Sequence, residues 1–214
     1  MIRHYLNELE QWKKRLTRKP LVIRGARQVG KTWLVREFAR TNFQNLVEIN
    51  FDETPESESL FQTNNVNEIV QLIEAEKGIN IIPGETLLFL DEIQSAPKVL
   101  PALRYFYEKI PELHIIVAGS LLGFLLSESQ FPMPVGRIEF MFLGPLSYEE
   151  YLMASSEHKL LDYINSLTLN SLLPDSIHKK CLTYLRNYFI VGGDARGSRF
   201  MGKAEGSHSD STVP

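Results

Sequence analysis

The stretch that decides the fold is GARQVGKT, residues 25–32, which directly follows the apolar run PLVIR. Two glycines bracket four residues, and Lys31 and Thr32 come next. Glycine lets the backbone curl so that successive N–H groups point inward at a phosphate. A helix that begins near Lys31 would direct its positive N-terminal end at the same point. Because such a loop must leave a strand and open a helix, this position predicts a phosphate-binding loop.

Within this loop, Lys31 would reach the β- and γ-phosphates, and the hydroxyl of Thr32 would bind Mg²⁺. ATP and Mg²⁺ are therefore the expected ligands. The alternative is a glycine turn that carries an exposed lysine, and the strand before the loop and the helix after it argue against this. The predicted nucleotide-binding residues are Gly25, Ala26, Arg27, Gln28, Val29, Gly30, Lys31 and Thr32.

A second signal is LLFLDE at residues 87–92, an apolar strand that ends in Asp91 and Glu92. In phosphate-loop NTPases an acidic residue at the end of a neighbouring strand holds Mg²⁺, directly or through water. A glutamate that follows it can act as the general base for the attacking water. Ligands of open α/β sheets bind at the carboxyl ends of the strands, where this pair is expected. We assign Asp91 with Thr32 to the metal and Glu92 to the base.

Three further residues give softer signals. Ser120 ends the apolar run IIVAGS and could orient water or touch the γ-phosphate, or it could simply cap the next segment. Arg137 could stabilise charge on the γ-phosphate in cis or from a neighbouring subunit, or it could be a surface arginine. Gln94 follows the acidic pair and could sense the nucleotide state. The candidate catalytic residues are Glu92, Lys31, Ser120 and Arg137.

Apolar patterns alternate between the strand and helix types along residues 20–146, which predicts an α/β fold with a parallel sheet and helices on both faces. An amphipathic helix is expected at 2–16, within an N-terminal element of residues 1–19. The expected strands lie at 20–25, 45–52, 85–93, 113–120 and 137–144, and the expected helices at 31–42, 66–78 and 98–110.

After Gly144 the pattern becomes helical, and we expect a helical segment over residues 147–193. Ser147 and Glu150 form a predicted capping box at its start. From Asp194 to residue 214 periodicity ends and aliphatic residues are scarce, so this tail is predicted to be disordered.

The net charge of -3 argues against a strong field for nucleic acid or anionic membrane. The stretch WKKRLTRK at 12–19 is basic, and we interpret it as a solvated helix end, with an anionic partner as the alternative. The single cysteine, Cys181, cannot form an intramolecular disulfide and is expected in the core. Neither a signal peptide nor a membrane span is expected, so the cytoplasm is the predicted location.

Five segments occur in an order that resembles prokaryotic AAA-type ATP-binding proteins of the AAA+ superfamily, in the branch near the archaeal ATPases and signalling NTPases. They are PLVIRGARQVGKTWLVREFA, LLFLDEIQ, LHIIVAGSLLG, PVGRIEFMFLGPLSYEEYL and YFIVGG. The resemblance covers about residues 1–193. It implies a phosphate-loop NTPase with a five-stranded sheet in the order 5-1-4-3-2, an ATP site with Mg²⁺, and a helical domain after the core.

The same resemblance implies individual roles. It makes Gly25, Gly30, Lys31 and Thr32 phosphate-loop residues, Asp91 and Glu92 the acidic pair, and Ser120 the polar sensor. Arg137 matches a recurring VGR/K element without a settled role. Family members usually continue well beyond VGG, so we interpret this chain as a truncated or frameshifted member, or as a fragment. The helices at 147–190 would normally pack against the downstream half, so we expect them to expose apolar surface, which favours aggregation or self-association.

The sequence leaves three functions open. The first is an ATPase that hydrolyses ATP through Glu92 and couples hydrolysis to movement of the helical segment. The second is a switch in which nucleotide orders a surface for an unknown protein or DNA partner with little turnover. The third is a kinase for a small acceptor, but the Asp91–Glu92 pair favours water as the acceptor and no arginine-rich lid is evident.

Overall fold

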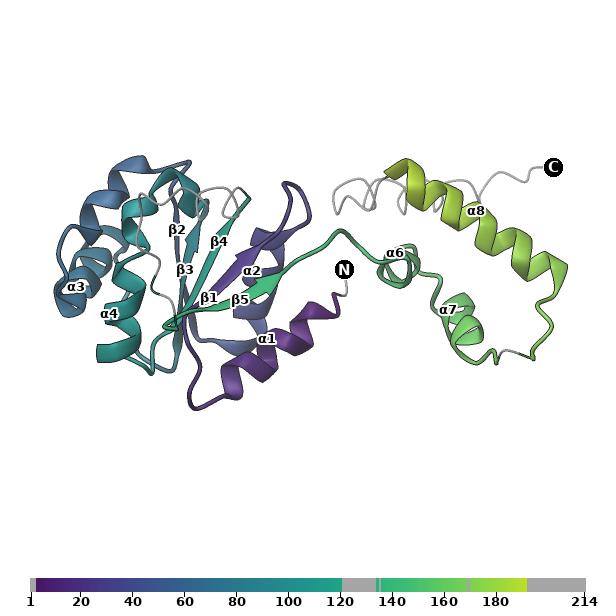
Figure 1. Cartoon of the computed structure of the whole chain (residues 1–214), viewed down its shortest axis with the longest axis horizontal. Coiled ribbons are helices and arrows are strands. Elements are labelled where there is room, and N and C mark those ends of the chain that lie inside the picture. The colour runs from purple at the N-terminus through teal and green to yellow at the C-terminus, as the bar shows by residue number, and fades with distance from the viewer. Residues whose placement is uncertain (1–2, 121–133, 135, 169, 192–214) are drawn as a thin grey trace, which may run out of the picture. The chain divides into compact units, whose positions relative to one another are not determined.

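The computed structural model describes residues 3–120, 134, 136–168 and 170–191 (Figure 1). Contacts divide the chain into two compact units. The first, called here the sheet unit, contains Tyr5–Arg27 and Lys31–Leu143. The second, called the helical unit, contains in its described part residues 3–4, 28–30 and the chain from Gly144 onward. The prediction of a disordered tail at 194–214 lies outside the described residues, as does the segment between residues 121 and 133.

The sheet unit is built on five parallel strands in the order β2-β3-β4-β1-β5. This is the predicted order 5-1-4-3-2 counted from the other edge, so the predicted fold is confirmed. Every residue of β3 and β4 is buried, as continuous apolar runs in a sheet covered on both faces require. The strands are β1 (Leu21–Arg24), β2 (Asn45–Asn50), β3 (Thr86–Asp91), β4 (His114–Gly119) and β5 (Glu139–Phe142).

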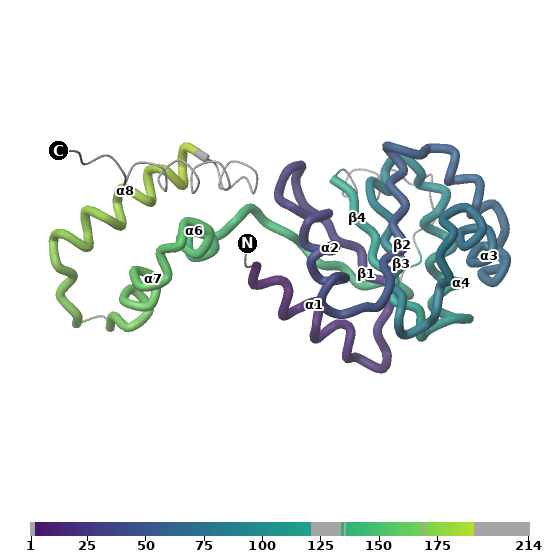
Figure 2. Tube along the Cα trace, turned by 180° about the vertical axis from the view of Figure 1, so that it is seen from behind, coloured from purple at the N-terminus to yellow at the C-terminus, as the bar shows by residue number. Residues whose placement is uncertain are grey.

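Helices cover both faces of this sheet. The two views show α1 and α2 on one side and α3 and α4 on the other (Figures 1 and 2). Gly78 closes α3 in a left-handed conformation, with its N–H bonded to Glu74 O. The helices are α1 (Tyr5–Lys14), α2 (Lys31–Asn42), α3 (Val66–Lys77) and α4 (Ala102–Lys109), with the 3-10 turns η1 (Pro55–Phe61), η2 (Ile93–Ser95) and η3 (Pro97–Val99).

Two predicted helices have different limits in the structure. The helix expected at 98–110 begins only at Ala102. Pro97 starts a tight 3-10 turn, and Pro101 lies directly before the first residue of the helix, where its fixed φ angle is tolerated. The helix expected at 2–16 ends at Lys14. The chain turns there, so Leu16 does not continue the apolar face of the helix and is 98% exposed.

The basic stretch at 12–19 is largely used inside the sheet unit. Arg15 forms an ion pair with Glu139 at 2.6 Å, and Arg18 donates to the carbonyl oxygens of Pro111 and Glu112. Side chains committed to internal acceptors have fewer donors left for phosphates. These contacts argue against an anion-binding patch, and they differ from the expected solvated helix end because Arg15 and Arg18 pair within the sheet unit.

The helical unit contains α6 (Tyr148–Ala154), α7 (His158–Asn165) and α8 (Asp175–Val191). The predicted capping box is confirmed, because the Ser147 hydroxyl accepts from Glu150 N and the Glu150 carboxylate accepts from Ser147 N. Cys181 is only partly buried and packs at the margin of a small core. This core consists of Leu152, Leu160 and Leu161.

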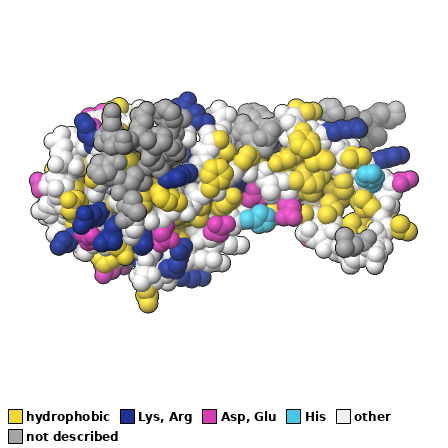
Figure 3. Space-filling model, in the orientation of Figure 1, with side chains coloured by type: hydrophobic (Ala, Val, Ile, Leu, Met, Phe, Trp, Pro, Cys, Tyr) yellow, Lys and Arg dark blue, Asp and Glu magenta, His cyan; other side chains and the backbone are white. Residues whose placement is uncertain are grey.

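Apolar side chains remain exposed on the helical unit (Figure 3). Leu172 is 93% exposed, and near the end of α8 Phe189 is 71% and Ile190 is 78% exposed. The exposed apolar surface predicted for these helices is therefore present. Over the part of the chain that the structure describes, none of the helices has the length and apolar character needed to cross a membrane.

Candidate nucleotide site

The predicted phosphate loop connects β1 to α2, since the strand ends at Arg24 and the helix begins at Lys31. Two of its residues have positive φ angles, 67° at Gln28 and 91° at Gly30. Glycine adopts this conformation readily, but a residue with a side chain does so at a cost of roughly 1–2 kcal/mol. Such strain persists only where the surroundings enforce it, which is common where a backbone is shaped for a ligand.

The ammonium group of Lys31 lies inside the curve of this loop. Its Nζ donates to Gly25 O at 3.1 Å and to Ala26 O at 2.8 Å, and the residue is only 7% exposed. Burial lowers the pKa of Lys31, while the nearby charges of Glu92 and Asp91 oppose this shift. The loop therefore holds a desolvated cation whose present partners are neutral carbonyls, and an anionic ligand would be a stronger partner.

Thr32 and Asp91 lie in direct contact. Thr32 Oγ1 donates to Asp91 Oδ2 at 2.7 Å, and Asp91 Oδ1 accepts from the backbone N of Glu92 at 3.0 Å. Asp91 is only 1% exposed, and burial raises the pKa of its carboxyl group, although the two hydrogen bonds act in the opposite direction. The structure thus brings together the two residues that the sequence assigned to the metal.

This oxygen pair fits a magnesium ion. Mg²⁺ is usually held by one or two carboxylates together with substrate phosphates and waters, and an all-protein cage is unusual. In the described parts of the chain, no group of three or more His, Cys, Asp or Glu residues forms a cage. A hydroxyl and a carboxylate beside a phosphate loop are the donor set that a nucleotide-bound Mg²⁺ requires.

Glu92 follows β3 in a left-handed conformation, with φ 51° and ψ 44°. Its backbone N donates to Asp91, the residue that contacts Thr32 at the start of α2. Gln94 Nε2 donates to Glu92 Oε2 at 2.5 Å. The sequence suggested Gln94 only as a nucleotide sensor, and its contact with Glu92 depends on the turn between them.

Ser120 leaves the sheet at the same edge as the phosphate loop. Arg24 is paired with Gly119, so Gly25 and Ser120 follow the ends of neighbouring strands. The Oγ atom of Ser120 is buried and has no hydrogen-bond partner among the described residues. A buried polar atom without a partner costs about 1–3 kcal/mol, which a bound ligand or water could recover.

Arg137 does not join this group. It precedes β5, whose first residue Glu139 is paired with Leu21 at the start of β1, so it lies near the amino ends of the strands. Its guanidinium group contacts Glu108 Oε1 at 3.0 Å, and Arg104 contacts the same atom. This position, at the opposite edge of the sheet from Lys31, gives no support to a role in cis.

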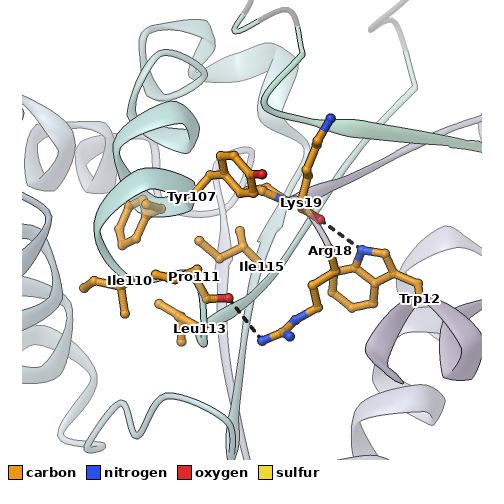
Figure 4. Close-up of a pocket in the computed structure, with 10 residues that line it drawn as sticks. Trp12, Arg18, Lys19, Tyr107, Ile110, Pro111, Leu113 and Ile115 are labelled. Carbon is orange, nitrogen blue, oxygen red and sulfur yellow. Dashed lines mark hydrogen bonds between the residues drawn. The ribbon is translucent and has the colours of Figure 1, made fainter. Parts of the chain in front are cut away.

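A small cavity also lies at this amino edge (Figure 4). Arg18 donates to Pro111 O on one side of it, and the indole N–H of Trp12 donates to Lys19 O on another. Its volume of about 10 Å³ is close to the least that one water molecule needs. The cavity is therefore too small for a nucleotide, and the site described above remains the candidate.

A parallel α/β sheet with a glycine-bounded loop at the end of one strand and an acidic pair at the end of another defines a phosphate-loop nucleotide-binding protein. A sequence model described as AAA domain matches residues 17–152. The chain therefore belongs to the AAA domain family and is an ATP-binding protein of the AAA type. No curated protein sequence gives a significant match.

Three solved structures are similar to this chain at low sequence identity, and the first, whose TM-score exceeds 0.5, shows the same fold. Drosophila ORC bound to DNA has a TM-score of 0.54 and 14% identity over 92% of this chain and 58% of that chain. ORC2 of Aeropyrum pernix, in ADPNP and ADP complexes, has a TM-score of 0.49 and 16% identity over 75% of this chain and 52% of that chain. C. elegans PCH-2 has a TM-score of 0.45 and 17% identity over 79% of this chain and 50% of that chain. The match thus covers about half the length of each of these chains.

Proposed function

We propose that this protein hydrolyses ATP with Mg²⁺ and uses the reaction to drive or switch a conformational change. The observation that carries the proposal is the 2.7 Å hydrogen bond between Thr32 and Asp91. It joins the phosphate loop to an acidic residue 59 positions later in the chain, beside Lys31 and Glu92. Carboxylates placed at a phosphate loop suit metal binding and activation of water, whereas binding of a phosphate alone would need neither.

Each residue then has a definite task. The backbone N–H groups of residues 25–32 bind the phosphates, and Lys31 exchanges its two carbonyl partners for phosphate oxygens. Thr32 and Asp91 would hold Mg²⁺, which when bound neutralises charge on the phosphates. Glu92 accepts a proton from the attacking water, and the hydroxyl of Ser120 orients that water or the γ-phosphate.

Arg137 would act on nucleotide only from a neighbouring subunit, because its own chain holds it at the amino edge of the sheet. The exposed Phe189 and Ile190 of α8 suit a protein partner or a second copy of the chain. A DNA partner has less support, since the net charge is -3 and arginines of the basic stretch have internal partners.

The direct test is phosphate release by Glu92→Gln, which keeps the shape of the side chain but removes the base. Turnover should fall by roughly 100-fold or more while ATP binding is retained. Glu10→Gln is a matched control, because Glu10 is an exposed residue of α1. Unchanged hydrolysis in Glu92→Gln would place the base elsewhere. Tight binding without hydrolysis in the wild type would instead favour a nucleotide-dependent binding switch.

A further inference from the structure

The turn after β3 is anchored independently of the side chain of Gln94. Ile93 is fully buried, and Ser95 N donates to Glu92 O at 3.0 Å. The Ser95 hydroxyl also donates to Asp52 Oδ1. Because these contacts hold the backbone, the turn has no evident need for the amide group of Gln94.

That amide instead contacts the carboxylate of Glu92, through the 2.5 Å hydrogen bond from Nε2 to Oε2. A carboxylate only accepts hydrogen bonds, so the NH₂ end of the amide must face it. The other end, Oε1 of Gln94, is buried without a hydrogen-bond partner in the described parts of the chain. The hydrogen bond to Glu92 is therefore the one that the structure records for this side chain.

We propose that Gln94 is a positioning residue that orients Glu92 for proton abstraction, an inference that rests on the proposed ATP hydrolysis. Glutamate has a long side chain, and a carboxylate without a fixed partner samples several rotamers. A charge-assisted bond to Oε2 selects one orientation and leaves Oε1 to accept the proton of the water. Gln94 itself touches neither water nor phosphate in this role.

Replacement of Gln94 by methionine tests this role, because methionine has a similar length but cannot donate a hydrogen bond. The value of kcat for ATP hydrolysis should fall by about tenfold or more, because small misplacements of a catalytic group are costly. The KM for ATP and the affinity measured by titration should stay within about twofold, since Gln94 does not bind the nucleotide. Gln94→Glu, which places a second carboxylate beside Glu92, should lower kcat at least as much.

Ser95→Ala is the matched control, because it removes a side-chain hydrogen bond of the same turn without touching Glu92. It should keep the wild-type kcat. Equal losses in Ser95→Ala and Gln94→Met would show that Gln94 acts only through the stability of the turn, which would overturn the proposal. A rise in kcat of Gln94→Met would also overturn it, because Gln94 would then restrain Glu92.

Coupling between the two residues gives the decisive readout. If Gln94 works through Glu92, adding Gln94→Met to Glu92→Gln should cause no further loss of kcat, whereas independent effects would multiply. A wild type without hydrolysis would refute the proposed function and this inference with it. A wild type that needs Glu92 but is unaffected by Gln94→Met would refute this inference alone.

Discussion

Replacement of Lys31 by methionine should weaken ATP binding while leaving the protein folded. In the structure the ammonium group has two carbonyl partners, at 3.1 Å on Gly25 and 2.8 Å on Ala26. Burial lowers the pKa of Lys31 although the charges of Glu92 and Asp91 oppose this shift, so a phosphate ligand would stabilise the charge further. Methionine has a similar length and removes this buried charge, so the loss should appear in binding more than in stability.

The magnitude follows from the contacts exchanged. ATP binding replaces hydrogen bonds to neutral carbonyls with hydrogen bonds to phosphate, so the full energy of the new contacts is not gained. A net loss of about 1.5–3 kcal/mol is expected, the value of one charge-assisted hydrogen bond. At 1.4 kcal/mol for each factor of ten, the Kd for ATP should rise by about 10- to 150-fold.

Isothermal titration with ATP and Mg²⁺ measures this change directly. Lys14→Met provides the control, because Lys14 is an exposed lysine at the end of α1. Its Kd should equal that of the wild type. The same Kd in Lys31→Met and wild type would refute the assignment of the phosphate site, and the unfolding temperature of each variant would show whether a loss of binding reflects a loss of fold.

Two further predictions concern buried titratable groups. Asp91→Asn should raise the Mg²⁺ concentration needed for half-maximal ATP hydrolysis. Because burial raises the pKa of Asp91, the Mg²⁺ concentration that the wild type needs should also rise as pH falls. An unchanged Mg²⁺ titration would contradict this. Burial lowers the pKa of His114 to about 4. In the unfolded state the His114 side chain has a pKa of about 6.5, so as pH falls it binds a proton in the unfolded state before it does so in the folded state. Acidification from about pH 6.5 to 4 should therefore lower the free energy of unfolding by about 2–3 kcal/mol. His114→Phe should remove that part of the pH dependence in thermal unfolding, and an identical pH profile would refute it.

Local patterns in the sequence were sufficient to predict the elements of the core. The alternation in β2, the continuous apolar runs of β3 and β4, and the capping box at Ser147 depend on residues within a few positions of one another. The phosphate loop and the acidic pair are likewise short patterns with fixed spacing. The limits of α1 and α4 were less accurate, because a turn ends α1 and two prolines delay the start of α4 where the apolar periodicity still continues.

Contacts between distant residues were decided by the tertiary structure alone. The parallel pairing of β1 with β4 and of β4 with β3 places the loop after β1 and the end of β3 at the same edge of the sheet, where Thr32 meets Asp91. The pairing of β1 with β5 places Arg137 at the opposite edge. No local spacing encodes such a meeting, because it depends on how strands far apart in the chain are aligned and packed. The same holds on a smaller scale for Gln94, whose amide reaches Glu92 because Glu92 adopts a left-handed conformation that its own side chain does not favour. The sequence by itself thus determined which residues can bind phosphate and metal, whereas the folded sheet and its turns determined which of them lie together.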